Sequence, residues 1–224
     1  MLPTDKRISC AIVEPRKHKA LRFVLENVHQ VLPDATIHLF HGTTNSLYAH
    51  RACQDFQNQV TFHNIDKRNL TLLEYNKLLT QPEFYETFQS EYVLIFQTDS
   101  MLFPQSLFDI SYFFGYDYVG APWKWAHRKD GGGNGGLSLR KVQSFIDILG
   151  KHEYPMSVNV AEDLFFDSLP LKFAPFDVAQ RFSVESVWYA APFGCHKPWQ
   201  YLNAEEYIQL QKYAPHIKSL FDLN

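Results

Sequence analysis

Apolar residues recur along the first part of the chain in two alternating periods, one typical of strands and one of helices. Short apolar runs at residues 8–13, 36–40 and 60–64 have the composition of buried strands. Between the first two runs, apolar residues follow the spacing of one helical face, at Leu21, Val24, Leu25, Val28 and Val31. Helical patterns also cover residues 46–56, more weakly, and residues 70–80. This opening predicts a β-α-β-α-β unit, which is typical of a parallel sheet with right-handed crossovers.

The strand at the centre of the sheet is predicted at residues 93–96, an apolar run without polar alternation. Thr98, Asp99 and Ser100 follow it directly. Open α/β sheets bind ligands in the crevice beyond the carboxyl ends of their strands, so we expect this cluster to face a ligand. Its carboxylate and hydroxyl oxygens suit a divalent cation that holds a diphosphate. The same residues also fit a turn in which Asp99 accepts hydrogen bonds from backbone N–H groups.

Beyond the central strand the chain is less regular and richer in glycine and aromatic residues. A strand is predicted at residues 116–122, and Trp123 and Trp125 follow it. Residues 131–136 hold five glycines, which either let the backbone approach a ligand closely or form a flexible loop. No Gly-Lys-Ser/Thr follows, so this segment is not a P-loop. Residues 137–140 lead directly into a predicted helix with Val142, Phe145, Ile146 and Leu149 on one face, so the glycines border an ordered element.

Two adjacent acidic residues, Glu162 and Asp163, precede an apolar helical start. A helix N-terminus favours negative charge, so both can have a structural role there. Alternatively, one carboxylate caps the helix while the other faces the crevice as a general base or as an acceptor for a sugar hydroxyl.

The last part of the chain offers a second group of polar candidates. After a predicted strand at residues 182–187, a compact loop at residues 192–199 carries His196 and Lys197, which it could place over a diphosphate. A lone His is usually structural, but this one lies among Gly, Lys and Pro-Trp. The residues at 203–206 have the pattern of a capping box and predict the start of the last helix.

Length and composition limit the class of protein. A chain of 224 residues, 46% hydrophobic and 20% charged, is expected to form one soluble domain. A formal net charge of −3 gives no case for a nucleic-acid partner. Three distant cysteines predict neither a disulfide framework nor a zinc site. The N-terminus lacks the apolar core of a signal peptide and no run reaches membrane-spanning length, so we expect a cytoplasmic protein without a transmembrane segment.

Four motifs, taken in order, resemble those of GT-A glycosyltransferases. They are an Asp-x-Asp-like cluster at residues 98–100, a Gly-Gly-x-Ser-Leu-Arg segment at 135–140, the Glu-Asp pair at 162–163 and a Gly-x-x-Lys-Pro-Trp loop at 194–199. The phrases Phe-Gln-Thr-Asp-Ser, Tyr-Val-Gly-Ala-Pro-Trp, Gly-Asn-Gly-Gly-Leu-Ser-Leu-Arg and Phe-Ser-Val-Glu further resemble a short family of unknown function within that fold. The resemblance covers roughly residues 8–200.

This resemblance implies one GT-A-like, Rossmann-like α/β domain over residues 1–224, with a mostly parallel sheet flanked by helices and a smaller irregular acceptor-side half. The nucleotide-sugar half would span about residues 1–103, the acceptor and catalytic half about 104–200, and a C-terminal helix 201–224. The implied activity is hexosyl or deoxyhexosyl transfer from a nucleoside-diphosphate sugar, with a UDP-sugar favoured. The acceptor would be a hydroxyl of a glycan, glycoconjugate or other molecule, and Mn²⁺ or Mg²⁺ would assist.

The resemblance also implies ligands for the metal and the donor. Asp99 and His196 would bind the metal, although glycogenin-like enzymes place this His three residues before the Gly-x-x-Lys-Pro-Trp motif, where Ala191 stands here. The second acidic position is missing as well, since Gln97 and Met101 flank Asp99 at a distance of two residues, so weaker metal binding is expected. The implied donor-binding residues are Glu14, Arg16, Asn76, Lys77, Thr98, Asp99, Ser100 and Lys197.

The remaining implied roles concern catalysis and the acceptor. Asp163 would deprotonate the acceptor hydroxyl with Glu162 as its helper, as in inverting members, while retaining chemistry remains open. Acceptor and sugar contacts would come from Trp123, Trp125, Asn134, Gly135 and Gly136. Because an aromatic ring can stack on a pyranose face, the two tryptophans are candidates for an acceptor platform, with a core role as the alternative.

Two other functions fit the same motifs. With one acidic ligand missing, the chain could be a GT-A-derived module that binds a glycan or nucleotide without turnover. A nucleotidyltransferase shares the fold type, but it would carry a Gly-rich loop after the first strand, and residues 14–17 contain no glycine.

Overall fold

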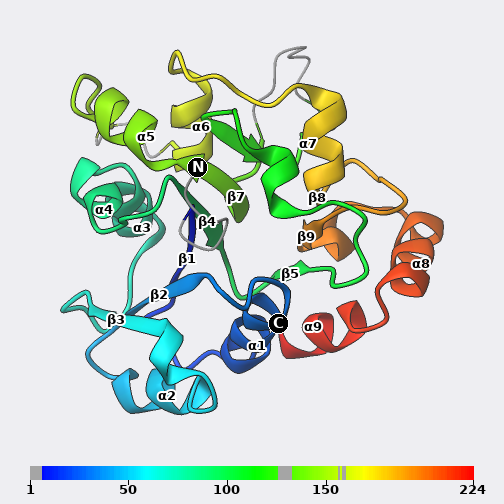
Figure 1. The fold of residues 1–224 in the computed structure, drawn as a ribbon, viewed down its shortest axis with the longest axis horizontal. Coiled ribbons are helices and arrows are strands. Elements are labelled where there is room, and N and C mark those ends of the chain that lie inside the picture. Colours follow the sequence, from blue (N-terminus) through cyan, green and yellow to red (C-terminus); the bar gives the residue numbers. More distant parts are fainter. Residues whose placement is uncertain (1–6, 126–132, 156, 158–159) are drawn as a thin grey trace.

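The computed structural model describes residues 7–125, 133–155, 157 and 160–224. Its main sheet has six strands in the order β3-β2-β1-β4-β7-β6 (Figure 1). The parallel strands are β1 (Ile8–Val13), β2 (Thr36–His41), β3 (Val60–Asn64) and β4 (Tyr92–Phe96). β7 (Leu137–Lys141) runs antiparallel to its two neighbours, β4 and β6 (Tyr118–Gly120). The carboxyl ends of β1 and β4 therefore lie side by side at one edge of the sheet.

Helices cover both faces of this sheet (Figure 1). Leu94 and Phe96 of β4 belong to one core, whereas Val93 and Ile95 belong to the other, as the alternation of side chains along a strand requires. The first core is shared with α1 (Leu21–Val31), α2 (Ser46–Ala52), α7 (Phe176–Phe182), α8 (Ala204–Tyr213) and α9 (Ile217–Leu223). The second is shared with α3 (Leu72–Leu79), α4 (Pro82–Glu86), α5 (Val142–Leu149) and α6 (Glu162–Asp167).

A second sheet of three strands joins distant parts of the chain. Its order is β5 (Ser100–Leu102), β9 (Gly194–His196) and β8 (Ser183–Val184), and Ser100 pairs with His196. The buried Asn27 of α1 anchors β5, because its side chain donates to the Leu102 carbonyl at 2.8 Å and accepts from the Leu102 N–H at 2.7 Å. This sheet brings β9 against the turn that follows β4.

The fold class predicted from the sequence is confirmed, and two local predictions need correction. Residues 137–140 lead into a helix as predicted, since α5 begins at Val142, and residues 137–141 form β7, a strand that the sequence pattern did not predict. The strand predicted at residues 182–187 is largely wrong, because Phe182 ends α7 and β8 covers Ser183–Val184. The last segment contains two helices, α8 and α9, in place of one, because Pro215 between them has no N–H to continue the first.

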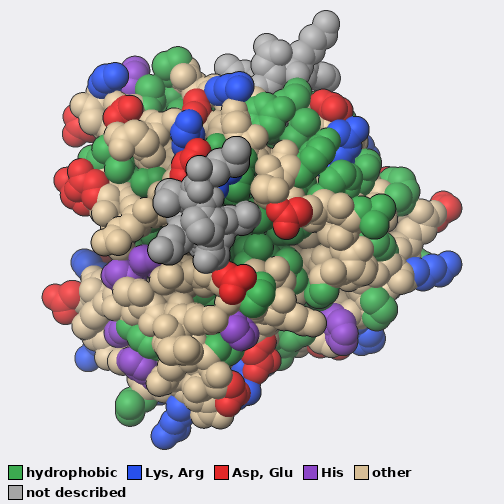
Figure 2. All heavy atoms as spheres, in the orientation of Figure 1, with side chains coloured by type: hydrophobic (Ala, Val, Ile, Leu, Met, Phe, Trp, Pro, Cys, Tyr) green, Lys and Arg blue, Asp and Glu red, His purple; other side chains and the backbone are tan. Residues whose placement is uncertain are grey.

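Surface charge and the cysteines complete the description of the fold. On the face shown in Figure 2, Lys and Arg side chains are scattered among acidic ones and do not form a basic patch. Several His side chains gather over β2, β3 and α2 in this view. The three cysteines are buried and unpaired. No helix within the described ranges is long and apolar enough to cross a membrane.

Candidate functional site

A cavity of about 440 Å³ opens beyond the carboxyl ends of β1 and β4. Its walls come from the turns after these two strands, from α3, from the start of α6 and from β9. Most of the residues proposed from the sequence line it, namely Glu14, Arg16, Asn76, Thr98, Asp99, Asn134, Gly136, Glu162, Asp163, His196 and Lys197. The parallel pairing of β1 with β4 explains why Glu14 and Asp99, far apart in sequence, meet at this edge.

Glu14 and Arg16 form a rigid pair at the end of β1. The buried Glu14 carboxylate accepts hydrogen bonds from the Arg16 backbone N–H at 2.8 Å and from Nε and Nη2 of its guanidinium at 2.8 and 2.7 Å. Asn45 secures the turn by donating to the carbonyls of both residues. The bond to Glu14 raises the pKa of Arg16, which therefore stays charged while its side chain remains 55% exposed. Arg16 thus offers a fixed positive charge to an anion in the cavity.

Asp99 lies opposite His196 at the floor of the cavity. Its Oδ1 is 3.2 Å from His196 Nε2, and His196 Nδ1 is 3.0 Å from Oε1 of Glu185. His196 and Glu185 are almost fully buried, with 1% and 2% of their surface exposed. Burial by itself would lower the pKa of His196, but the two carboxylates outweigh it and raise the pKa. Burial would likewise raise the pKa of Asp99, but His196 and Lys197 lower it.

These atoms fit a divalent cation. Asp99 Oδ1 and His196 Nε2 are both buried and face each other at 3.2 Å, and among the described residues neither atom has a hydrogen bond to any other group. One carboxylate oxygen and one imidazole nitrogen form a donor set that suits Mn²⁺ and also accepts Mg²⁺. The described part of the chain contains no group of three or more His, Cys, Asp or Glu side chains that could hold a metal. A cation here would need further ligands from a bound diphosphate or from water.

Lys197 has an unusual backbone conformation beside this pair. Its φ of 32° and ψ of 49° lie in the left-handed region, and Pro198 follows it. Its N–H donates to the Asp99 carbonyl at 2.9 Å, which joins the loop to the turn after β4. A residue with a Cβ adopts this conformation at a cost, and such costs are concentrated at functional sites.

Gly136 allows the His196 ring to lie where it does. A Cβ at position 136 would lie 2.2 Å from His196 Nε2, far inside van der Waals contact. Asn134 Oδ1 accepts the Gly136 N–H at 2.6 Å, and the Gly136 carbonyl accepts from Ser100 Oγ at 2.8 Å. Over the described residues 133–136, the glycine segment therefore brings the backbone close to the side chain of His196.

A fully buried arginine orients Glu162. Arg140 on β7 has no exposed surface, and its Nη2 donates to Glu162 Oε1 at 2.8 Å. Its Nε donates to Ser138 Oγ and its Nη1 to Tyr85 OH. Its guanidinium carbon lies 5.1 Å from the centre of the Phe166 ring, within range of a cation–π contact. The Arg140 guanidinium therefore fixes the position of the Glu162 side chain at the cavity wall.

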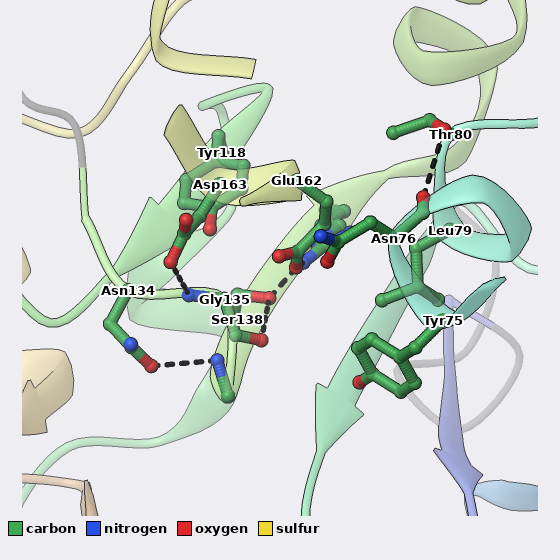
Figure 3. Close-up of polar contacts among 12 residues, drawn as sticks. Tyr75, Asn76, Leu79, Thr80, Tyr118, Asn134, Gly135, Ser138, Glu162 and Asp163 are labelled. Carbon is green, nitrogen blue, oxygen red and sulfur yellow. Dashed lines mark hydrogen bonds and ion pairs between the residues drawn. The ribbon is translucent and has the colours of Figure 1, made fainter. Parts of the chain in front are cut away.

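Asp163 lies next to Glu162 and faces the same cavity (Figure 3). Its carboxylate accepts from the Gly135 N–H at 3.2 Å and from the Leu164 N–H at 2.8 Å. Burial, followed by the neighbouring charge of Glu162, raises the pKa of Asp163 to about 6. A carboxyl group with such a pKa can accept and release a proton near neutral pH.

Helix α3 supplies the remaining wall. Its N-terminus has a capping box between Thr71 and Glu74. Asn76 is buried and donates to the Val160 carbonyl at 3.1 Å, while Figure 3 shows its side chain beside that of Glu162. Tyr75 OH accepts from Gln97 Nε2 at 2.8 Å, and both residues line the cavity.

Five of the residues proposed from the sequence do not line the cavity. Lys77 is exposed on α3, and Gly135 contributes its N–H to Asp163. Ser100 is buried, accepts from the Gln97 N–H and donates to the Gly136 carbonyl, so it supports the turn. Trp123 is 8% exposed, whereas Trp125 is 57% exposed.

Other residues of the site were missed by sequence reasoning. The Trp125 ring lies 5.7 Å from that of Tyr201, which is 41% exposed. No spacing identifies Tyr201, Glu185, Tyr75 or Arg140. Glu185 and Arg140 at least lie in segments that resemble the family, such as Phe-Ser-Val-Glu for Glu185, whereas Tyr75 and Tyr201 lie in none of them.

A family model matches residues 56–196, which is more than half of the chain. Its description is "Protein of unknown function (DUF5672)". The chain belongs to this family. The search of curated proteins gave no match. Neither of these two comparisons names an activity for the chain.

Two structures of LgtC resemble the fold of this DUF5672 protein at low sequence identity, and a third solved structure gives a lower score. The galactosyltransferase LgtC in complex with donor and acceptor sugar analogs gives a TM-score of 0.59 at 12% identity, with 96% of this chain and 94% of that chain covered. An active-site mutant of LgtC gives 0.56 at 11% identity over the same shares. The inositol-1-phosphate CTP transferase from T. maritima gives 0.49 at 12% identity, covering 93% and 96%. The likeness to LgtC confirms a GT-A-like fold.

Proposed function

We propose that this protein is a glycosyltransferase that moves a sugar from a nucleoside-diphosphate sugar, with a UDP-sugar favoured, to a hydroxyl of a glycan or other acceptor. One observation carries the proposal. In a single cavity, the cations Arg16 and Lys197 lie on one side, next to the facing atoms of Asp99 and His196, and the acidic residues Glu162 and Asp163 lie on the other. The first side suits a diphosphate leaving group and the second suits a sugar and its acceptor.

On the cationic side, Arg16 and Lys197 would hold the diphosphate. Both are charged side chains at the cavity wall, and Arg16 is fixed by Glu14. Asp99 and His196 would hold Mn²⁺ or Mg²⁺, which when bound supplies positive charge to the diphosphate. Charge held in place before the reaction stabilises the leaving group without reorganisation.

On the acidic side, Asp163 would take the proton from the acceptor hydroxyl. Its pKa of about 6 leaves it mostly deprotonated at neutral pH and still basic enough to accept a proton. Glu162, with one oxygen bound to Arg140, would accept hydrogen bonds from hydroxyls of the donor sugar. Trp125, together with Tyr201, would offer exposed rings on which the acceptor sugar stacks.

The two halves of the domain would divide this work. The first half, about residues 1–103, would supply Arg16 and Asp99 to the nucleoside diphosphate of the donor. The second half, about residues 104–200, would supply Glu162 to the donor sugar and Asp163 to the acceptor. His196 and Lys197 are the exception, because β9 returns them to the donor side.

A thermal-shift panel of UDP-, GDP-, dTDP- and CMP-sugars, with and without Mn²⁺, tests the proposal. A ligand present at about 100 times its Kd stabilises the folded state by about 2.7 kcal/mol, which is readily detected. We expect a Mn²⁺-dependent shift with one nucleotide and no shift in Asp99→Ala. The matched control is Asp34→Ala, an exposed carboxylate that precedes β2 at the opposite edge of the sheet.

Turnover separates the enzyme from a binding module. One observation favours the binding module. Asp99 and His196 are the two facing candidate metal ligands, and Gln97, which stands two residues before Asp99 where a second acid could lie, donates a hydrogen bond to Tyr75. The donor that gives a shift is therefore incubated with mono- and disaccharide acceptors, and release of the nucleoside diphosphate is followed by chromatography. Release that requires an acceptor and is lost in Asp163→Asn supports transfer. Donor binding without release under any of these conditions means that the protein binds without turnover.

A further inference from the structure

Glu185 has no role in the function proposed above, although it is one of the most buried charged residues in the described chain. It follows β8 directly, and 2% of its surface is exposed. Its Oε1 lies 3.0 Å from His196 Nδ1. Burying a carboxylate is costly unless it is paired and hydrogen-bonded, so the presence of a glutamate at this buried position calls for an explanation.

The contact with Glu185 determines which ring nitrogen of His196 carries the proton. A carboxylate only accepts hydrogen bonds, so the short contact requires a proton on Nδ1. In the neutral ring Nε2 then has a free lone pair. That lone pair points towards Asp99 Oδ1 at 3.2 Å, which is also an acceptor, and neither atom has another hydrogen-bond partner among the described residues.

The ring has little freedom to turn away from this arrangement. Gly136 approaches it so closely that an added Cβ would lie 2.2 to 2.5 Å from Nε2, Cε1 and Cδ2. A ring flip would also replace Nδ1 by a carbon atom and leave the buried Glu185 carboxylate without its donor. The backbone of His196 is fixed too, through the pairing of β9 with Ser100 on β5.

We infer that Glu185 is a positioning residue that holds His196 as the Nδ1–H tautomer, so that Nε2 and Asp99 Oδ1 together bind a divalent cation. This rests on the metal-assisted function proposed above. A carboxylate behind a metal-bound imidazole fixes the orientation of the ring and increases the basicity of the ligating nitrogen. Glu185 would also partly compensate for the missing second acid, because its negative charge on the far side of the ring strengthens the binding of the cation by Nε2.

Three variants distinguish a role of Glu185 in orienting His196 from a role in stabilising the fold. Glu185→Ala removes the acceptor of the Nδ1 proton. Glu185→Gln keeps an acceptor oxygen of the same length but removes the charge. Ser186→Ala is the matched control, because its hydroxyl binds the Lys124 N–H and the Pro122 carbonyl in the same segment without touching His196. Thermal melting identifies any variant that has lost its fold.

The first readout is the tautomer of His196 in the metal-free protein at alkaline pH, measured by ¹⁵N NMR of the imidazole nitrogens. The chain has ten histidines, so His196→Gln identifies the signal by its loss. We expect the Nδ1–H form in wild type, Ser186→Ala and Glu185→Gln. In Glu185→Ala the proton should move at least partly to Nε2, where it can donate to Asp99.

The second readout is the affinity for Mn²⁺ alone, measured from the EPR signal of the free ion. We expect a loss of about 10–100-fold in Glu185→Ala, a smaller loss in Glu185→Gln and none in Ser186→Ala. A His196 tautomer that does not change in folded Glu185→Ala would overturn the inference, and so would a changed tautomer with unchanged Mn²⁺ affinity. Neither readout uses a nucleotide sugar, so the inference can hold when every donor fails, and can fail when a donor binds.

Discussion

The strained backbone at Lys197 predicts that Lys197→Gly is more stable than Lys197→Ala, although both variants lose function. Lys197 has a φ of 32°, and Asp66, with a φ of 52°, is the other non-glycine residue with positive φ in the described chain. The left-handed region costs a residue with a Cβ roughly 1–2 kcal/mol. Glycine removes this cost but loses roughly 0.5–1 kcal/mol through the greater freedom of the unfolded chain. Lys197→Gly should therefore be more stable than Lys197→Ala by about 0.5–1 kcal/mol.

Both variants lose the ammonium group at the cavity wall, so both should bind a nucleoside diphosphate about ten-fold or more weakly, as expected for a lost charge-assisted hydrogen bond. Urea unfolding measures the stability, and isothermal titration with the nucleotide identified in the donor panel measures the binding. Asp66→Gly is the control, because it relieves a similar conformation outside the cavity lining. It should gain stability and leave binding unchanged. Equal stabilities of Lys197→Gly and Lys197→Ala would refute the argument from strain.

Three further predictions follow from the site. Gly136→Ala would place a Cβ 2.2 Å from the imidazole of the site, so Mn²⁺ affinity measured by EPR should fall at least ten-fold, whereas Gly150→Ala, whose Cβ meets nothing closer than 3.4 Å, should leave it unchanged. The raised pKa of Asp163, about 6, predicts that kcat/KM rises with pH as the carboxyl group loses its proton. Because this folded pKa lies above the unfolded value of about 4, the contribution of Asp163 to stability is largest in acid and is lost as pH rises from about 4 to about 6. Urea unfolding should therefore show Asp163→Asn gaining about 3 kcal/mol on wild type across that pH range. Finally, Arg140→Met should destabilise the fold by about 3–5 kcal/mol in urea, because Glu162 is left buried without its partner, and adding Glu162→Gln should restore most of the loss. A double variant as unstable as the single one would contradict this explanation.

The sequence pattern predicted the parallel half of the fold because that half follows local rules. β1, β2, β3 and β4 are apolar runs separated by helical spacing, and their shared direction places Asp99 at the same edge as the end of β1. The position of Asp99 in a crevice thus followed from topology alone.

The second half could not be predicted in the same way, because several of its buried side chains are polar or charged. The alternation at residues 182–187 resembled a strand with an apolar face. In the structure the buried side chains of that segment include Ser183, Glu185 and Ser186, and helix α7 extends to Phe182. β7 was missed for a similar reason, since it carries the fully buried Arg140, which no rule based on hydrophobic period would place in a core.

The same difference limits prediction of the site. Candidates at strand and helix ends, such as Asp99 and Asp163, could be proposed from chemistry and position. Residues that act through a partner, such as Glu185 behind His196, become visible only when two distant segments are paired.

The small sheet has a consequence for how such a protein can change by recombination. β5 follows Asp99 directly, while β9, its partner, contains His196 and lies near the end of the second half. The first core likewise combines residues from Ile8 to Leu220. A gene fragment for the first half alone would therefore encode Asp99 without the facing His196, and the first core would lack the side chains of α7, α8 and α9. We expect the two halves to be inherited together, so that variation arises by substitution within one intact chain.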